Sequence, residues 1–267
     1  MVKNKGGIMA TVEEIREWKK QGKNREIIAA VQSEEVSRNT KNDEKLLEKA
    51  WAHHQLGEYD ESLPIMSALA EYYSPLNEIG ESALRGYAHG ILQRDSDIHT
   101  ADDVMKRIPL SMARDNVRIN MMIMAVRKGL AIPAEEIMFM ITNALQSVPY
   151  ATVNGHIVNN GALVLHEARQ QEAIKLYLSI LPGLMDTAIG IYKFTKSPEN
   201  HIAGAEFRAA QICRANGWLK LAKLSAEESV ALWRDLVNSQ DGERYQKNLE
   251  GARELLKDLE WDTMGMV

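Results

Sequence analysis

The chain has 267 residues, of which 45% are hydrophobic and 26% are charged, and its 32 basic and 37 acidic side chains give a formal net charge of −5. This apolar content excludes a disordered chain, which could not bury enough surface to offset the entropy of ordering. The acidic balance argues against a nucleic-acid binder, which carries a basic excess. The single cysteine, Cys213, excludes an internal disulfide framework and a cysteine-based zinc cage.

Residues 1–8 are basic and contain glycine, but they lack the apolar segment of ~7–15 residues that a secretory signal needs. We therefore expect residues 1–10 to be a flexible leader. No window approaches ~18 uninterrupted apolar residues, so we expect no membrane insertion and a cytoplasmic location.

Helical periodicity is the main pattern in the rest of the chain. Apolar residues in 44–56 recur at three- and four-residue steps, which predicts a helix that ends at Gly57. Thr11 with Glu14, and Thr100 with Asp103, have the capping-box spacing of a helix start. The expected helices are 12–21, 24–37, 44–56, 60–73, 78–93, 100–108, 115–128, 133–146, 156–168, 170–181, 203–216, 219–238 and 241–259.

These helices form pairs joined by short turns, and the turns recur at a roughly constant interval. The turn positions lie 35, 37, 35, 39 and 49 residues apart, at Gly22, Gly57, about Arg94, Gly129, Ala168 and Gly217. A helix–turn–helix unit with a period near 34 residues is typical of a helical repeat. No sustained alternation of apolar and polar residues predicts a strand.

At these turns the chain resembles the tetratricopeptide repeat (TPR) family. The clearest unit is 45–75, in which 56–63 (LGEYDESL) is similar to the family's turn, and 155–181 and 203–235 repeat the spacing. The resemblance covers residues 11–238. It implies an all-α superhelical array of about six antiparallel helix pairs, a TPR-like α-solenoid, followed by a C-terminal capping helix and tail in 239–267. Small residues would let paired helices approach closely: Ala50, Ser62, Ala134, Gly161, Ala173, Ala210 and Ala222.

Two departures from the family pattern are visible. The unit near residues 76–109 lacks a turn glycine, and the last interval carries an insertion around residues 187–200. The helix expected at 241–259 is strongly charged on one face, as the capping helix of a repeat array would be.

The resemblance also implies a function, because TPR arrays bind peptides or partner proteins in a concave groove lined by the first helix of each unit. We therefore predict a non-catalytic scaffold or adaptor with a protein or peptide partner. The residues expected to bind this partner are Trp51, His54, Asn116, Asn120, Asn159, Phe207, Arg208 and Arg214. Further groove-facing candidates are Leu47, Ile119, Ile123, Val158, Ala162 and Gln211.

Asn120, Asn159 and Arg208 occupy equivalent places in three consecutive units, so stacking would align them along one surface. Asparagine can donate to and accept from a peptide backbone, and arginine can bind a carboxylate through two nitrogens. The lysines of a carboxylate clamp are absent, however, and Gly204 stands where one would be expected. Three readings of these polar residues stay open: a carboxylate clamp, a different polar peptide contact, or a solvated helix face.

The motifs of catalysis and cofactor binding do not occur in the sequence, so we expect no metal and no cofactor. His53-His54 has only Glu58 at helical spacing from His54, and Cys213 lies in an apolar stripe with no evident base. Neither glycine-rich nucleotide motif is present. Seven methionines between Met105 and Met140 predict an inter-repeat core or a methionine-lined binding patch.

Two other functions remain open. The chain could be a self-assembling homo-oligomer that uses exposed repeat faces. It could instead be an effector-sensing regulator or an enzyme, with a small-molecule pocket among Asn116, Asn120, His156, Asn159 and Arg208. A DNA-binding regulator is disfavoured, because no separate basic helix-turn-helix precedes the repeats.

Overall fold

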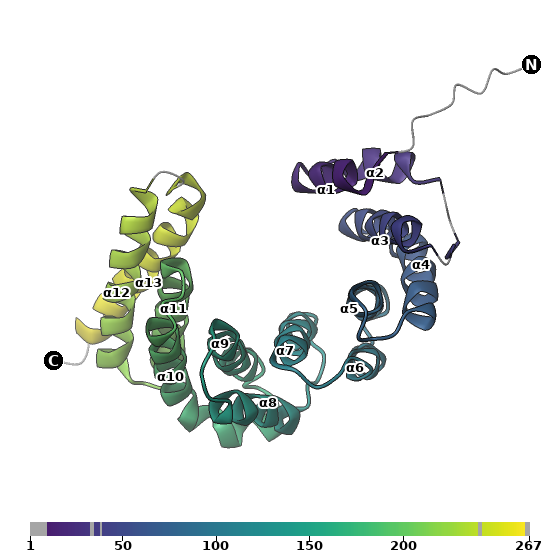
Figure 1. The fold of residues 1–267 in the computed structure, drawn as a ribbon. Coiled ribbons are helices and arrows are strands. Elements are labelled where there is room, and N and C mark those ends of the chain that lie inside the picture. The colour runs from purple at the N-terminus through teal and green to yellow at the C-terminus, as the bar shows by residue number, and fades with distance from the viewer. Residues whose placement is uncertain (1–9, 33–34, 38, 240–241, 265–267) are drawn as a thin grey trace, which may run out of the picture. The chain divides into compact units, whose positions relative to one another are not determined.

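The computed structural model describes residues 10–32, 35–37, 39–239 and 242–264, and the regular structure of these residues is entirely helical (Figure 1). The all-α prediction is confirmed for this part of the chain. Most of the leader expected at 1–10 lies outside the described residues. The α-helices are α1 (Val12–Lys20), α2 (Asn24–Ala30), α3 (Thr40–Gln55), α4 (Tyr59–Tyr72), α5 (Glu78–Asp95), α6 (Ile98–Lys106), α7 (Met112–Arg127), α8 (Ala134–Gln146), α9 (Thr152–Glu167), α10 (Leu181–Phe194), α11 (Glu199–Ala215), α12 (Leu219–Val237) and α13 (Gln246–Met264). Two 3-10 helices, η1 (Glu172–Ile180) and η2 (Gly242–Tyr245), complete the elements.

Contacts divide the chain into two compact units, Met1–Arg114 and Asp115–Val267. In the first unit, α3 packs on α4, α4 on α5 and α5 on α6, with α1 and α2 against α3. In the second unit, α9 packs against both α8 and α10, while α11 packs against α10 and α12, and α13 covers α12. Sequential neighbours thus supply most of the packing within each unit.

Local sequence signals explain where most helices begin. At α1 the predicted capping box forms: Thr11 Oγ1 accepts from the Glu14 N–H at 3.2 Å, and the Thr11 N–H donates to the Glu14 carboxylate at 2.7 Å. The second predicted capping box is wrong. Asp97 caps α6 instead, accepting from the Thr100 N–H at 3.0 Å and from the Thr100 hydroxyl at 2.6 Å, so the helix begins two residues earlier than expected.

The turns follow the glycines that the sequence singled out. Gly22, Gly57, Gly129 and Gly217 each follow a helix with φ between 69° and 76°, a left-handed conformation that glycine adopts without a Cβ clash. The unit without a turn glycine uses Ser96, with φ 55°, for the same purpose. One expected helix is too long: α2 ends at Ala30, whereas the sequence predicted residues 24–37, of which 33 and 34 lie outside the described residues.

The segment from 170 to 200 differs most from expectation. The sequence predicted a helix over 170–181 that ends before Pro182, but Pro182 lies in the first turn of α10, where its missing N–H loses no intrahelical bond. The helix continues to Phe194 and takes up half of the expected insertion. The preceding residues form η1 rather than an α-helix, and Ala173, expected to be buried, is exposed there. Together, η1 and α10 are longer than the helix expected at 170–181, and this extra length accounts for the widest interval, the 49 residues between Ala168 and Gly217.

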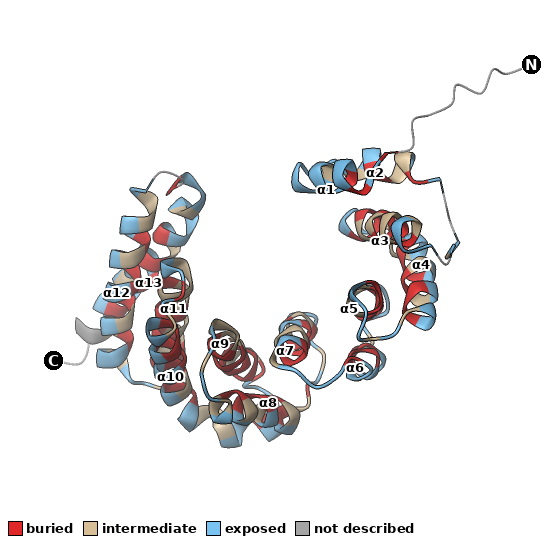
Figure 2. Cartoon of the chain, in the orientation of Figure 1, coloured by how far each residue is buried: buried red, intermediate tan, exposed pale blue. Residues whose placement is uncertain are grey.

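Six of the seven small residues are buried, and at Gly161 the predicted close approach of two helices is visible. Gly161 of α9 faces α8, and a Cβ placed there would lie 2.7 Å from Ile141 Cδ1 and 2.8 Å from Ile141 Cγ1. The other buried small residues are Ala50, Ser62, Ala134, Ala210 and Ala222. Figure 2 shows buried residues along the helices of both units, and α9 is buried over most of its length. The charged side of α13 is exposed, while Leu255 and Leu259 pack with Ala210 and Ala222.

One described stretch, Glu172–Phe194, is long and apolar enough to span a membrane by length and composition alone. Of its most apolar window, 44% is buried inside the protein, a property shared with core helices.

Replacing Gly161 with leucine should destabilise the fold. The new side chain would overlap Ile141, and overpacking of this kind costs about 1–3 kcal/mol. Urea unfolding of the full chain measures the loss of unfolding free energy.

Gly190→Leu is the matched control, because no described atom lies within 4 Å of a Cβ at this exposed position of α10. It should keep or raise stability, since leucine favours the helix over glycine. Equal stability of the two variants would show that α8 and α9 do not approach at Gly161.

A polar cavity as the candidate functional site

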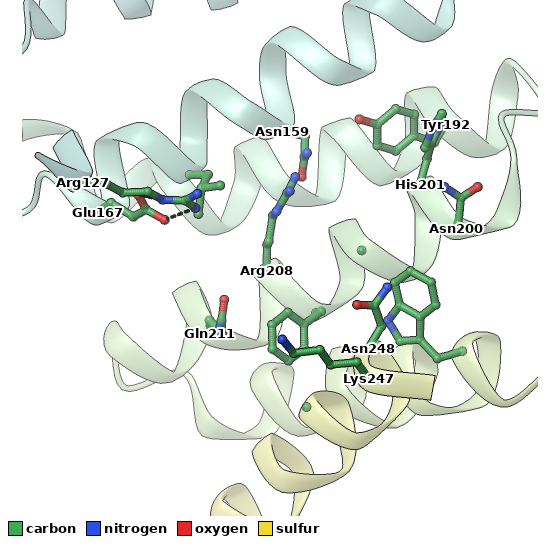
Figure 3. Close-up of a pocket in the computed structure, with 15 residues that line it drawn as sticks. Arg127, Asn159, Glu167, Tyr192, Asn200, His201, Arg208, Gln211, Lys247 and Asn248 are labelled. Carbon is green, nitrogen blue, oxygen red and sulfur yellow. Dashed lines mark hydrogen bonds and ion pairs between the residues drawn. The ribbon is translucent and has the colours of Figure 1, made fainter. Parts of the chain in front are cut away.

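The candidate site is a cavity of about 660 Å³ in the second unit, walled by α7 and by α9 to α13 (Figure 3). Three predicted binding residues, Asn159, Phe207 and Arg208, line it, as does the further candidate Gln211. The remaining lining residues are Arg127, Leu163, Glu167, Tyr192, Asn200, His201, Gly204, Trp233, Lys247, Asn248 and Gly251.

A row of polar side chains joins the helices beside the cavity. Asn160 of α9 donates from Nδ2 to Asn120 Oδ1 of α7 at 2.9 Å, and its Oδ1 accepts from Arg208 Nη1 of α11 at 3.0 Å. A second link joins α7 to α9, because the Arg127 guanidinium donates to both Glu167 oxygens at 2.9 and 3.1 Å. The sequence predicted this alignment of α7, α9 and α11, but through Asn159 rather than Asn160.

Arg208 is the central cation of the site. Its side chain is partly buried and reaches from α11 toward Asn159 of α9 (Figure 3). Within the described part of the chain, no carboxylate forms an ion pair with it. Burial lowers the pKa of the guanidinium, and Arg127 lowers it further, although Tyr192 and Glu167 act in the opposite direction. Arg208 stays protonated, because an arginine cannot lose its proton in a protein.

Asn159 is 3% exposed and lines the cavity. Its Nδ2 donates to Asn160 Oδ1 at 2.9 Å, whereas its own Oδ1 accepts no hydrogen bond from any described residue. A buried acceptor left unpaired costs roughly 1–3 kcal/mol. Asn159 therefore places an unpaired buried acceptor in the wall of the cavity.

Two histidines and a tyrosine form a cluster on one wall. His156 Nδ1 lies 2.8 Å from Tyr192 Oη, and the His156 ring meets the His201 ring edge-on with centroids 4.7 Å apart. His201 Nδ1 is buried and has no partner among the described residues. Burial lowers the pKa of both histidines, and positive charge on His201 and Arg208 lowers that of His156 further. Sequence reasoning named His156 but missed Tyr192 and His201, which come from two later helices.

Residues that the sequence did not single out complete the walls. Trp233 of α12 packs with Phe207, and Lys247 and Asn248 come from the start of α13 (Figure 3). The charged lining groups are therefore Arg127, Arg208 and Lys247 against the single carboxylate of Glu167. Polar residues at a helix start carry no sequence signal that separates a cavity wall from a solvated face, which is why Lys247 and Asn248 were missed.

Several predicted groove residues lie elsewhere. Arg214 does not line the cavity: its guanidinium binds Asp262 at 2.8 Å and Asp258 at 3.1 Å and so links α13 to α11. Asn116 of α7 is partly buried, with an Oδ1 that lacks a partner in the described residues. Four apolar candidates are buried in the core instead of facing a groove: Ile119, Ile123, Val158 and Ala162.

Trp51 and His54 belong to the first unit. Trp51 is partly buried and donates from its indole N–H to Ser82 Oγ at 3.0 Å. His54 is buried, contrary to prediction: its ring packs against Trp51 and Tyr59 with centroids 5.1 Å apart, and its Nε2 contacts His89 Nδ1. Leu47 is also buried, although it borders a smaller pocket with Ser82.

No protein-family model matches the chain, and a search of curated proteins gives no match either. Within the described residues, no three side chains of histidine, cysteine, aspartate or glutamate lie close enough to hold a metal ion.

Burial of His54 should make the fold sensitive to acid. Burial and the neighbouring His89 lower the pKa of His54 to about 4, from 6.5 in the unfolded chain. Between these two values the unfolded chain binds a proton that the folded chain does not, so the free energy of unfolding falls as the pH drops from 6.5 to 4. One histidine contributes at most about 1.4 kcal/mol per pH unit to this slope.

Urea unfolding across this pH range should show a shallower slope for His54→Gln than for the unmodified chain. His99→Gln, which changes an exposed histidine of α6, should keep the full slope. If the two variants lose stability in parallel, His54 is not a buried neutral histidine.

Proposed function

We propose that the chain is a non-catalytic, TPR-like helical-repeat module, and that its cavity binds a peptide segment of a partner protein. The observation that carries this proposal is the pair formed by Asn159 and Arg208. Asn159 has an unpaired buried acceptor, and Arg208 has N–H donors with no carboxylate partner among the described residues. A peptide backbone supplies both an N–H and a C=O at each residue, so it complements such a pair.

The walls of the cavity fit an extended polar segment with some apolar contact. Phe207 and Trp233 give aromatic surface, while Asn200, Gln211 and Asn248 add amides that can donate and accept. Aromatic side chains beside polar groups are typical of recognition surfaces, because they bury large area at low entropic cost.

The chemistry of Cys213, which could act as a nucleophile only as a thiolate, also supports a binding role. Cys213 is buried among Ala210, Ala222 and Leu255, and burial raises the pKa of its thiol. A reactive cysteine needs the opposite shift, since the thiolate is the nucleophile. Tyr192 has a raised pKa for the same reason and stays a neutral hydrogen-bonding group.

Asn159→Ala combined with Arg208→Ala should weaken binding without unfolding the chain. The probe is a library of random decapeptides selected on the immobilised full chain, followed by titration of the enriched peptides. Losing two polar contacts, one of them charged, should lower affinity about tenfold or more. Circular dichroism reports whether helicity is retained.

Arg234→Ala is the control, because it removes an exposed arginine of α12 that does not line the cavity. It should bind as the unmodified chain does. Unchanged affinity in the double variant with unchanged helicity would refute the cavity as the peptide site, and a selection that enriches no peptide over bare resin would refute peptide binding.

A further inference from the structure

We propose that the exposed side of α10 is a dimer interface, and that its partner is a second copy of this chain, related by a two-fold axis that passes beside Gly190. This surface, the α10 face, consists of residues 148–150, Asp186, Thr187, Gly190, Lys193 and Phe194. It shares no residue with the lining of the polar cavity, so the inference stands apart from the proposed peptide binding.

The α10 face contains an apolar cavity with exposed apolar side chains in its wall. The cavity, of about 560 Å³, lies between residues 148–150, which connect α8 to α9, and the exposed side of α10. Val148 is 79% exposed and Phe194 is 70% exposed, and both line the cavity. Exposed apolar side chains gathered around one cavity, unlike those scattered singly, mark an interaction site.

The α10 face has both parts of an aromatic contact, an exposed ring and a cavity with room for one. In a two-fold pair each copy presents the same surface, so Phe194 of each copy can enter the cavity of the other. With the axis beside Gly190, Phe194 of one copy lies opposite Asp186 and Thr187 of the other, which line the cavity. Each ring buried in this way removes about 150–250 Å² from water.

The charges of the α10 face are complementary to themselves. Asp186 and Lys193 are exposed at positions i and i+7, so at about 100° per residue they lie on one edge of α10, two turns apart. When two copies of a helix pair antiparallel about a two-fold axis, equal edges meet in opposite order. An axis midway between the two residues, next to Gly190, therefore places each Asp186 opposite a Lys193 of the second copy and gives two ion pairs.

Both charged side chains are available for such pairs. Asp186 is exposed. Lys193 Nζ lies 3.6 Å from Glu206 Oε1, yet 54% of the Lys193 side chain remains exposed, so it can approach a second carboxylate.

Gly190 lies where the two copies of α10 would cross. No described atom lies within 4 Å of a Cβ at this position, so no side chain there holds a second helix away. Gly190→Leu would therefore separate the two copies while leaving each folded.

A second copy fits the α10 face better than a lipid surface does. Asp186 lies in the cavity wall, and a carboxylate pressed against lipid loses its hydration with no partner to replace it, whereas Lys193 of a second copy supplies one. The contact is small, because α10 is only about 21 Å long and a stable interface buries about 1,200 Å² or more. We therefore expect a weak dimer with a Kd in the micromolar range.

The first experiment measures the oligomeric state of the full chain by sedimentation velocity, over a concentration series that spans the micromolar range. The unmodified chain should pass from monomer to dimer. Phe194→Ala should raise the Kd of the dimer about tenfold or more, since the main apolar contact is lost from both copies. Phe139→Ala is the matched control, because it removes an exposed phenylalanine of α8 that does not line this cavity. Circular dichroism reports whether helicity is retained.

The second experiment tests the antiparallel arrangement through its charges. Asp186→Lys and Lys193→Asp should each weaken the dimer about tenfold or more, because like charges then face each other at both contacts. In an equimolar mixture of the two variants, a copy with two lysines meets a copy with two aspartates. The mixture should therefore dimerise as the unmodified chain does.

Each outcome bears on one part of the inference. A chain that stays monomeric at every concentration would overturn the dimer, and equal weakening by Phe194→Ala and Phe139→Ala would overturn its placement on α10. A mixture that associates no better than its components would overturn the antiparallel arrangement. A monomeric chain that co-sediments with vesicles of phosphatidylcholine and phosphatidylserine, but not as Phe194→Ala, would assign the α10 face to lipid instead.

Discussion

A partly buried cation that is held by an amide, and not by an acid, is the constraint that sets the character of the cavity in the second unit. The Arg208 guanidinium reaches Asn160, and Asn160 reaches Asn120, so one row of hydrogen bonds joins α11, α9 and α7. An ion pair at this place would satisfy Arg208 and close the site. The neutral amide of Asn160 fixes the side chain and leaves its charge without a carboxylate partner among the described residues.

Close helix packing makes this row possible. Gly161, one residue after Asn160, brings α9 onto α8, where even a Cβ would meet Ile141. On the other side of the cavity, Leu249 and Ala252 of α13 pack with Val230 and Trp233 of α12, which brings Lys247 and Asn248 to the cavity wall. The Arg214 pairs with Asp258 and Asp262 add a link between α13 and α11 near the other end of α13.

The helices were predictable because their signals are local. Periodicity, the Thr11 cap and the four turn glycines depend on residues within one or two turns of each other, and the structure agrees at these places. The sequence predicted that a helix ends before Pro182, whereas α10 begins there. Proline is common both after the end of a helix and in the first turn of the next, so its position alone does not say which of the two occurs.

The candidate site was less predictable, since it depends on helix rotation. Successive residues on a helix point about 100° apart, so an error of one residue exchanges Asn159 for Asn160 as the linking side chain. For the same reason His54 and Val158, expected in a groove, are buried. Arg214 could not be assigned from sequence, because its partners lie more than 40 residues away on a helix whose docking the sequence does not specify.

The cavity also links binding to stability. The unpaired Asn159 oxygen and the partly desolvated Arg208 both raise the free energy of the empty folded state. A ligand that satisfies them stabilises the folded chain alone, because the unfolded chain cannot assemble residues from α9 and α11 into one site. Replacing Arg208 by a neutral side chain would therefore weaken binding and at the same time relieve a cost in the empty protein. Such opposed effects distinguish a side chain retained for recognition from one that holds the fold together.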